Sequence, residues 1–297
     1  MERILLITNA DAGSNESDPL DAALAVLSGQ ADLEVAQTAD TADLDGVLAR
    51  RADRRVVVAG GDGSLHALLA ALYRRGELSE AVVGLIPLGT GNDFARSVGV
   101  PLDPGDAARL SLHGEVRAVD LLEDQVGTII VNAVHVGVGA EAGREAKGWK
   151  SRIGKPGYVV GAVIAGLKTQ GLRLRVEADQ EVVTDLDRLV LQVGVGNGRT
   201  VGGGTELLPD ADPEDGLLDV VVSFATAPLR RLSYAARLKQ GTHPRLRDVR
   251  YLRAREVSVT GQDFWCNADG ELEGPDRHRA WRVVPGAARM VLPPRRS

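Results

Sequence analysis

Two glycine-rich segments follow apolar runs in this chain, and the first carries an acidic residue at its centre. Gly60-Gly61-Asp62-Gly63-Ser64 lies between the apolar residues 56–59 and a helical pattern that begins at Leu65. Glycine lets the backbone approach a ligand closely, and a helix N-terminus offers unpaired N–H groups to an anion. Because Asp62 alone would repel a phosphate, its position predicts a magnesium ion between the carboxylate and the phosphates. The alternative is a tight strand-to-helix turn capped by Ser64.

The second segment is Leu88-Gly89-Thr90-Gly91-Asn92-Asp93-Phe94, which follows the apolar residues 82–87. Two such loops at the carboxyl edge of one parallel sheet meet at a switch point, where nucleotides usually bind. Gly137, Gly139 and Ala142 also fit a dinucleotide fingerprint, but they lie in the β-rich half, and we treat that match as chance. The sequence has no GxxxxGK[ST], HRD or DFG motif, which excludes P-loop and protein kinases.

The apolar patterns around these loops predict a parallel sheet covered by helices on both sides. Residues 4–8, 33–36, 56–59 and 82–87 are short apolar runs, and helical spacings separate them. Residues 65–73 have the spacing of one face of an amphipathic helix. Strands that are apolar on both faces and alternate with helices are typical of α/β folds.

The pattern changes after about residue 120. Strand-like runs separated by turn residues follow, at residues 129–138, 172–178, 189–195, 217–224 and 257–260. Helical patterns are sparse and occur at residues 158–169 and 229–239. We therefore expect an α/β domain in residues 1–122, a β-sandwich in residues 123–284, and a tail, residues 285–297, that returns to the first domain.

The overall composition limits the partners and the compartment. The chain has 297 residues, 3% of them aromatic, and a formal net charge of −6. Few stacking side chains and the wrong sign of charge exclude a general nucleic-acid binder. The single cysteine, Cys266, excludes an intramolecular disulfide. The start of the chain does not resemble a signal peptide, and the longest nearly apolar run, residues 158–167, is too short to span a bilayer, so we expect a cytoplasmic protein.

The two loops together resemble the bacterial diacylglycerol kinase and YegS-like lipid kinase family, which is related to sphingosine and ceramide kinases and more distantly to NAD kinases. The resemblance rests first on residues 60–64 and 87–95. Further matches follow in the same order along the chain, at residues 9–13, Asp120-Leu121, residues 196–204, residues 209–219 and Asn267-Ala268-Asp269-Gly270-Glu271. The resemblance implies an N-terminal Rossmann-like parallel sheet that binds the nucleotide and a C-terminal β-sandwich domain that binds the lipid, as in the NAD kinase and diacylglycerol kinase fold.

The resemblance also implies roles for single residues. The nucleotide would be bound by Thr38, Gly60, Gly61, Asp62, Gly63, Ser64, Leu65, His66, Thr90 and Asn92. Asp93 and Asp120 would help to organise magnesium. A separate magnesium site in the second domain would use the Asp215 carboxylate and the backbone carbonyls of Asp212 and Leu217. Oxygen ligands suit this hard cation.

Asp269 and Glu271 are the candidates for the catalytic base. A carboxylate can accept the proton of a lipid alcohol as the phosphoryl group transfers. The residues alone favour a hairpin, because Asp-Gly is a common turn signal, whereas the resemblance favours catalysis. Residues i and i+2 share a face only if the segment is extended, so the sequence leaves open which carboxylate is the base.

The chain departs from the family pattern in three places. Ser64 replaces a threonine and keeps its hydroxyl, His66-Ala67 replaces Asn-Glu, and Asn9-Ala10 lacks a proline. None of these changes removes a carboxylate that the chemistry requires, so an active enzyme is expected.

We therefore predict an ATP- and Mg²⁺-dependent lipid kinase that phosphorylates a hydroxyl of diacylglycerol or a related lipid. The alternatives are a kinase of a soluble alcohol such as NAD and a non-catalytic, nucleotide-gated lipid-binding protein. Between residues 229 and 256, nine Arg or Lys residues stand against Asp248 and Glu256. This basic block predicts peripheral contact with anionic lipids at the inner face of the membrane, and a solvated helix face is its alternative. The lipid acceptor and a homodimeric state stay open.

Overall fold

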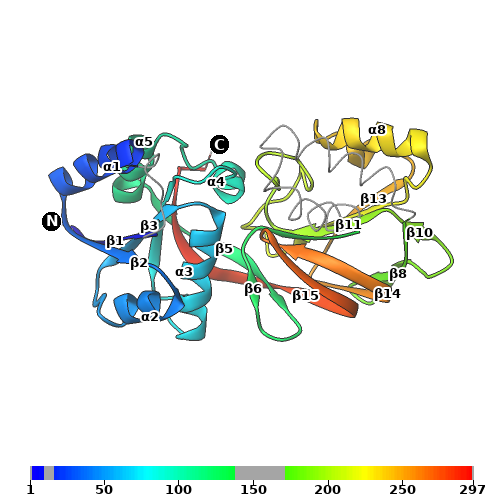
Figure 1. Cartoon of the computed structure of the whole chain (residues 1–297), viewed down its shortest axis with the longest axis horizontal. Helices are drawn as coiled ribbons and strands as arrows, with labels where there is room; N and C mark the ends of the chain where they lie inside the picture. The colour runs from blue at the N-terminus through cyan, green and yellow to red at the C-terminus, as the bar shows by residue number, and fades with distance from the viewer. Residues whose placement is uncertain (1, 10–16, 138–170, 296–297) are drawn as a thin grey trace.

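The computed structural model describes residues 2–9, 17–137 and 171–295, which form two lobes joined along one continuous sheet (Figure 1). Residues 10–13 of the first matched loop, Gly139 and Ala142 of the fingerprint match, and the predicted helix at 158–169 lie outside the described residues.

The first lobe is built on parallel strands. They are β1 (Glu2–Asn9), β2 (Ala31–Thr38), β3 (Arg55–Gly60) and β4 (Val82–Pro87), in the order β2-β1-β3-β4. The helices are α1 (Ser17–Gln30), α2 (Thr41–Ala49), α3 (Asp62–Arg74), α4 (Asp93–Val98) and α5 (Pro104–His113). Helices α1 and α5 cover one face of the sheet, and α2 and α3 cover the other (Figure 1).

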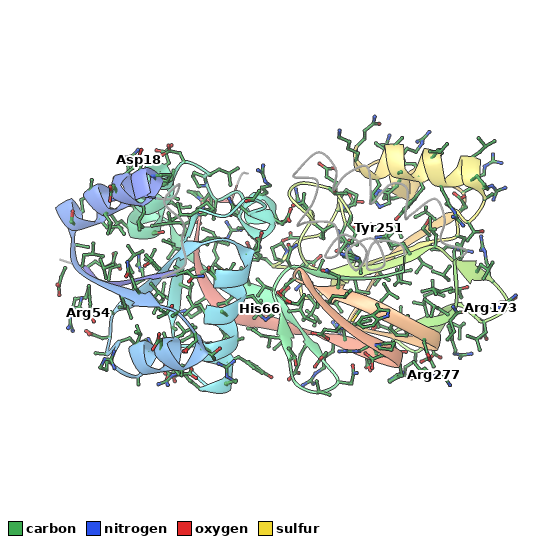
Figure 2. All side chains as sticks on the ribbon, viewed as in Figure 1. Asp18, Arg54, His66, Arg173, Tyr251 and Arg277 are labelled. Carbon is green, nitrogen blue, oxygen red and sulfur yellow. The ribbon has the colours of Figure 1, made fainter. Side chains whose placement is uncertain are left out.

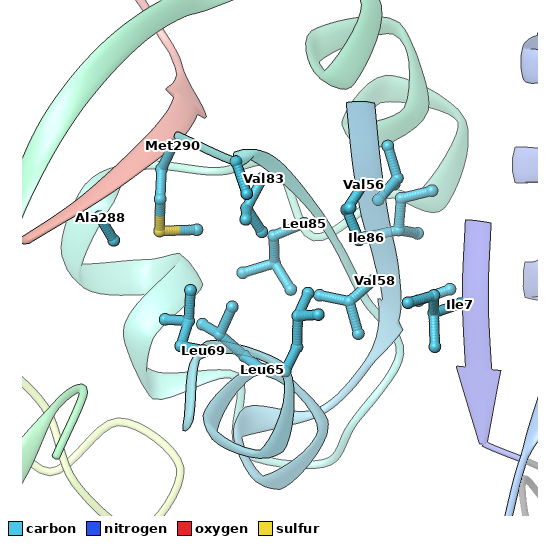
Figure 3. Packing of buried hydrophobic residues seen from close by; sticks show 14 of the residues in the cluster. Ile7, Val56, Val58, Leu65, Leu69, Val83, Leu85, Ile86, Ala288 and Met290 are labelled. Carbon is cyan, nitrogen blue, oxygen red and sulfur yellow. The ribbon is translucent and has the colours of Figure 1, made fainter. Parts of the chain in front are cut away.

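Burial on both faces explains why the strands are apolar along their length. In β3 and in β4, five of the six residues are buried. Helix α3 directs Leu65 and Leu69 into the core beside Val58 and Leu85, and Met290 from the far end of the chain joins the same cluster (Figure 3). The hydrophobic effect therefore fixes the position of α3, and with it the glycine loop at its N-terminus.

The second lobe is mainly antiparallel. Its strands are β5 (Glu115–Asp124), β6 (Ile129–Ile130), β7 (Ala133–Gly137), β8 (Leu172–Ala178), β9 (Glu181–Thr184), β10 (Leu189–Val190), β11 (Gln192–Gly196), β12 (Leu218–Ser223), β13 (Val249–Ala254), β14 (Glu256–Ala268) and β15 (Glu271–Leu292). Helix α8 (Pro228–Leu238) and the short 3₁₀ helix η1 (His243–Arg245) lie outside this sheet. The predicted α/β and β-sandwich classes are confirmed.

The last strand, β15, connects the lobes. It pairs with β14 in the second lobe and with β5 from Trp281 to Leu292. At its end, Arg289 and Met290 pair in parallel with β4 of the first lobe. The hydrogen-bonded sheet therefore runs from β2 at one end to β13 at the other.

Two predicted strands are wrong in their extent. The run predicted at 129–138 is divided into β6 and β7, because the N–H groups of Val131 and Asn132 donate to the Asp269 carboxylate instead of to a neighbouring strand. The run predicted at 189–195 is divided at Leu191, since β10 pairs with β8 whereas β11 pairs with β7 and β12. Most of β14 and β15 was not predicted, because polar residues interrupt their apolar alternation.

Candidate active site

The carboxyl ends of the parallel strands meet at one edge of the first lobe. Gly60 at the end of β3 pairs with Pro87 at the end of β4, and Thr38 pairs with Asn9 in the neighbouring strands. The Thr38 hydroxyl lies 3.4 Å from the Thr8 carbonyl oxygen, to which it donates. The loops that follow β3 and β4 therefore lie at the sheet edge where α/β folds bind their ligands.

The two glycine loops touch each other, as predicted. The Leu88 N–H donates to the Gly60 carbonyl at 3.0 Å. A Cβ atom at position 89 would lie only 2.5 Å from the Cα of Gly61, so a side chain at Gly89 would push the loops apart. Glycine is therefore required here for the close approach of two backbones.

Helix α3 presents unpaired N–H groups beside the second loop. It begins at Asp62 with Gly61 as its N-cap, and no side chain caps it, so the alternative of a turn capped by Ser64 does not hold. The N–H groups of Ser64 and Leu65 donate to the Gly61 carbonyl. The N–H groups of Asp62 and Gly63 have no backbone acceptor among the described residues. This end of the helix is suited to a phosphate.

Asp62 ties the two loops together. Its carboxylate accepts the N–H groups of Asp93 and Phe94, each at 3.0 Å, and so caps α4. Burial raises the pKa of Asp62, and the nearby carboxylates of Asp93 and Asp269 raise it further. A cation bound beside Asp62 would offset the repulsion between these carboxylates.

Asp93 joins the two lobes. Its two carboxylate oxygens accept the N–H groups of Gly203 and Gly204 at 2.8 and 2.9 Å. The Thr200 hydroxyl also donates to the Asp93 carbonyl, at 3.3 Å. These contacts give Asp93 a structural role at the junction, and its part in organising magnesium stays a prediction.

Asp269 lies in the hairpin turn between β14 and β15. The turn consists of Asp269 and Gly270, with φ angles of 48° and 94°, and Ala268 pairs with Glu271 across it. Positive φ at both central residues is typical of a type I′ turn, in which Asp-Gly is favoured. The turn predicted from the residues alone is thus present, and it points back towards the first lobe.

The Asp269 carboxylate is fully engaged. It accepts the N–H groups of Val131, Asn132 and Ala133 at 2.6, 2.9 and 3.2 Å. It also accepts a hydrogen bond from Nδ1 of His66 on α3, with a distance of 2.9 Å between Nδ1 and Oδ2. His66 lies at the junction of the lobes in Figure 2. The turn is therefore held against the N-terminal part of α3.

The acidic residues of the β14–β15 hairpin affect the pKa of His66. Its hydrogen bond with Asp269 raises its pKa, although partial burial opposes the shift. The carboxylates of Asp269, Glu271 and Glu273 also raise the pKa of His66. The sequence predicted His66 among the phosphate ligands, whereas its side chain contacts Asp269 in the hairpin.

Glu271 differs from Asp269 in its surroundings. Glu271 is exposed, and no side-chain or backbone group of the described residues donates a hydrogen bond to its carboxylate. It follows Asp269 by two positions at the start of β15, close enough to affect the pKa of His66. Its oxygens are therefore available to a substrate.

The remaining nucleotide candidates differ in what they offer. The side chain of Leu65 is buried in the core, so only its backbone can face a ligand. Thr90 is exposed between the two glycines of its loop. Asn92 has a left-handed backbone and donates to the Gly89 carbonyl at 2.7 Å, which shapes the loop from within. Within the described residues, Thr38 on the edge strand β2 donates to Thr8 and makes no hydrogen bond to either glycine loop.

The predicted second-lobe magnesium residues come together with Asp120. The Asp120 carboxylate accepts the N–H groups of Gly216 and Gly286 at 2.6 and 2.7 Å. Burial raises the pKa of Asp120, and the carboxylates of Asp215 and Asp212 raise it further. Within the described ranges, no three His, Cys, Asp or Glu side chains are grouped to hold a metal ion, so a site here depends on carbonyl ligands.

Such carbonyl ligands are present. The carbonyl oxygens of Asp212 and Leu217 accept no backbone hydrogen bond from the described part of the chain. One oxygen of Asp215 accepts the Leu217 N–H at 3.0 Å, and the other lies 3.6 Å from the Arg253 guanidinium. These oxygens fit a hard dication, while both oxygens of Asp120 are already used by N–H groups.

The basic block is divided among several elements. Arg230, Arg231 and Arg237 lie on α8, whereas Arg250 and Arg253 lie on β13. Arg253 is 3.6 Å from a carboxylate oxygen of the fully buried Asp219. The block is therefore not one surface: its exposed residues lie on or beside α8 (Arg230, Arg237 and Lys239) and also on and around β13 (Arg245, Arg247, Arg250, Arg253 and Arg255).

The backbone donors that hold Asp269 could not be predicted from the sequence pattern. Residues 131–133 act through their N–H groups, which carry no side-chain signature. Asn132 also donates from its side chain to the Thr200 carbonyl at 2.7 Å, which links this donor loop to the segment that contacts Asp93. A short polar break in a long apolar run is the feature that could have indicated such a loop.

The first lobe is a parallel sheet with two touching glycine loops, and β15 joins it to a β-sandwich. This arrangement is the fold class shared by NAD kinases and diacylglycerol kinases. Residues 3–123 match the model of the diacylglycerol kinase catalytic domain, and residues 132–292 match that of the YegS C-terminal NAD kinase beta sandwich-like domain. The chain belongs to the YegS-like lipid kinase family.

Individual relatives agree with this assignment. A protein of Stenotrophomonas maltophilia (strain K279a) named "Probable lipid kinase YegS-like" is 35% identical, covering 97% of this chain and 95% of its own. A protein of Pseudomonas aeruginosa with the same name is 35% identical over 80% of this chain and 76% of its own. Among solved structures, a diacylglycerol kinase from Bacillus anthracis str. Sterne shares the fold with a TM-score of 0.68 and 22% identity, covering 99% of this chain and 97% of that one. No helix in the described residues is long and apolar enough to cross a membrane.

Proposed function

We propose that this protein transfers the γ-phosphoryl group of ATP to a hydroxyl of diacylglycerol or a related lipid, in a magnesium-dependent reaction. The observation that carries the proposal is the 2.9 Å hydrogen bond between His66 and Asp269. It holds a turn that carries two carboxylates against the helix whose N-terminus is suited to phosphate. The helix N-terminus that is suited to phosphate belongs to the first lobe, and the exposed Glu271 carboxylate belongs to the second. The hydrogen bond between His66 and Asp269 holds them near each other.

The phosphate side of the site is supplied mainly by the backbone. The free N–H groups of Asp62 and Gly63 at the start of α3 would donate to phosphate oxygens, with the exposed Thr90 hydroxyl on the adjoining loop. Fixed N–H donors need little reorganisation as negative charge moves during the reaction.

Glu271 is the proposed base, and Asp269 is the residue that positions it. The four hydrogen bonds to Asp269 leave its carboxylate little capacity to accept a proton, whereas the exposed Glu271 carboxylate is unengaged. As the lipid hydroxyl oxygen bonds to the γ-phosphorus, the bond from that phosphorus to the β,γ-bridging oxygen breaks. The hydroxyl proton passes to Glu271. ADP leaves, and its former bridging oxygen keeps the electron pair of the broken bond.

Two places fit magnesium: the Asp62 carboxylate between the glycine loops, and the Asp215 group in the second lobe. The cation supplies charge neutralisation for phosphate oxygens when it is bound with the nucleotide. At the second-lobe site, the Asp215 carboxylate and the carbonyls of Asp212 and Leu217 would hold an ion. There it would offset the negative charge of Asp215 and Asp212, which adds to burial in raising the pKa of Asp120.

A panel of acceptors tests the proposal. The full chain is incubated with ATP and MgCl₂ and, in separate reactions, with detergent-dispersed diacylglycerol, phosphatidylglycerol or sphingosine, or with NAD in solution. Mass spectrometry then identifies the phosphorylated product. We expect a phosphorylated lipid whose formation stops when EDTA replaces magnesium.

Other outcomes contradict the proposal in distinct ways. Phosphorylation of NAD alone would make the protein a kinase of a soluble alcohol. ATP binding, seen by calorimetry, without product from any acceptor would leave a nucleotide-gated binding protein. As a matched control, Glu181→Gln, an exposed glutamate on β9, should retain wild-type turnover.

A further inference from the structure

Helix α8 exposes apolar side chains on the face that points away from the protein. Leu229 is 82% exposed and Leu232 is 51% exposed, whereas Tyr234 is buried. The Tyr234 hydroxyl donates to the side chain of Gln192 on β11 at 3.1 Å, which fixes the helix on the sheet. In Figure 1, α8 lies along the outer side of the second lobe.

The spacing of these residues separates an inner and an outer stripe. Arg231, Tyr234 and Leu238 are the residues with reduced exposure, at positions i, i+3 and i+7. Leu229, Leu232 and Ala236 have the same spacing and are exposed. Because a helix turns by 100° per residue, the second stripe lies on the opposite side from the first. The outermost line of the helix is therefore apolar.

Basic side chains flank this apolar stripe. Arg230, Arg237 and Lys239 are exposed, and residues 227–241 contain no Asp or Glu. Arg230 lies 4.0 Å from Asp248, and its side chain is still 68% exposed. The chain as a whole carries a net charge of −6. An anionic surface would thus repel most of the molecule and attract this helix, which fixes the orientation of approach.

We propose that α8 is the membrane-docking element of this protein and that its partner is an anionic lipid surface. Leu229 and Leu232 enter the boundary between head groups and acyl chains, and Arg230, Arg237 and Lys239 contact lipid phosphates. An apolar stripe bordered by Lys or Arg is the pattern of helices that lie in a membrane interface. The inference rests on the proposed function, because a lipid kinase must reach its acceptor in the bilayer.

Charge and apolar exposure together favour a membrane over a second copy of the chain. A second copy of the chain could place only local acidic patches against the basic side chains of α8. An anionic bilayer presents lipid phosphates along the whole length of the helix. Two exposed leucines on a short helix are also a small area for a stable protein dimer.

Vesicle sedimentation without ATP tests the docking directly. The full chain is mixed with vesicles of 30% phosphatidylglycerol in phosphatidylcholine, or of phosphatidylcholine alone. We expect binding to the anionic vesicles that weakens with salt. In Leu229→Ser/Leu232→Ser the partition coefficient should fall at least about tenfold, since two apolar anchors are lost. The control Leu102→Ser/Leu186→Ser changes leucines that are 40% and 46% exposed elsewhere, and it should bind like the wild type.

A second pair of variants tests the charges. Arg230→Glu/Arg237→Glu should also lose binding to anionic vesicles, whereas Arg109→Glu, whose side chain is 55% exposed on α5, should not. Wild-type partition in either α8 variant overturns the proposal. So does a wild-type dimer in light scattering that the leucine variant converts to monomers without a change in vesicle binding, because α8 would then be an interface between copies.

Kinase assays on detergent-dispersed lipid separate the two proposals. All α8 variants should retain wild-type turnover on dispersed substrate, because α8 lies outside the active site. Lipid phosphorylation with no vesicle binding by the wild type would remove the docking proposal alone. Vesicle binding that depends on α8, with no lipid phosphorylated, would remove the proposed function alone.

Discussion

His66 on α3 and Asp269 in the β14–β15 turn are joined by a hydrogen bond of 2.9 Å between Nδ1 and Oδ2. One residue follows the glycine loop of the first lobe, and the other belongs to a hairpin 203 positions further along the chain. The contact brings the exposed Glu271 to the start of α3. The positions of these residues form the basis of the proposed chemistry.

The pair should make stability depend on pH in a defined direction. The pKa of His66 is raised in the folded protein by Asp269, with Glu271 and Glu273 adding to the shift. Its contribution is therefore complete below the unfolded pKa of about 6.5 and is lost as the pH rises through the raised value. The difference in melting temperature between the wild type and His66→Asn should be larger at pH 6 than at pH 9. An equal difference at both pH values would contradict the charged pair.

Asp269→Asn should destabilise the protein. The Asp269 side chain is 4% exposed and accepts three backbone N–H groups, so an amide in its place would turn N–H groups towards these donors. We expect a loss of about 1–3 kcal/mol, measured by urea denaturation. In the same variant, NMR titration should show a lower pKa for His66. Asp263→Asn, on the exposed part of β14, is the control, and an equal denaturation midpoint in the two variants would argue against the role of Asp269.

The parallel strands and their loops could be predicted from the sequence because each signal is local. Residues 56–59 and 82–87 are buried on both faces, so they are continuously apolar, and each is followed at once by glycines. The contact between the loops then follows from the adjacency of β3 and β4. The resemblance supplied Asp269 and Glu271 as a pair without distinguishing them.

The distinction between the two carboxylates could not be predicted, because it depends on contacts between distant segments. The N–H groups of residues 131–133 engage Asp269 wherever their side chains point. His66 reaches the same carboxylate only because α3 is packed on β3 and β4. Similarly, the exposure of Leu229 depends on Tyr234 anchoring α8, and apolar periodicity alone does not show which stripe faces inward.

Asp62→Asn should lower turnover by at least about a hundredfold, because placement of the metal supplies several kcal/mol of charge stabilisation. The carboxylate also accepts the N–H groups of Asp93 and Phe94, and an amide can keep only one of these bonds. Steady-state kinetics at saturating ATP is the measurement. Asp106→Asn, in the first turn of α5, should retain activity. Near-wild-type turnover in Asp62→Asn would refute the role of this carboxylate.

Gly89→Ala should weaken both the fold and ATP binding. The added Cβ would lie 2.5 Å from the Cα of Gly61, so the loops must separate. We expect a cost of about 1–3 kcal/mol in urea denaturation and a higher Kd for ATP in calorimetry. Gly29→Ala, in α1 with open space around it, is the control and should stabilise the protein by up to about 1 kcal/mol. An ATP affinity unchanged by Gly89→Ala would show that the contact between the loops is not needed for nucleotide binding.

The single-turnover rate of phosphoryl transfer from γ-labelled ATP to diacylglycerol, or to the acceptor found in the panel, tests the assignment of Glu271 most directly. General-base catalysis contributes about 10²–10⁴-fold, so Glu271→Gln should slow this step by at least a hundredfold. Its ATP affinity and melting temperature should match those of the Glu181→Gln control. A Glu271→Gln enzyme that transfers the label at the wild-type rate would show that the exposed carboxylate beside His66 is not the base.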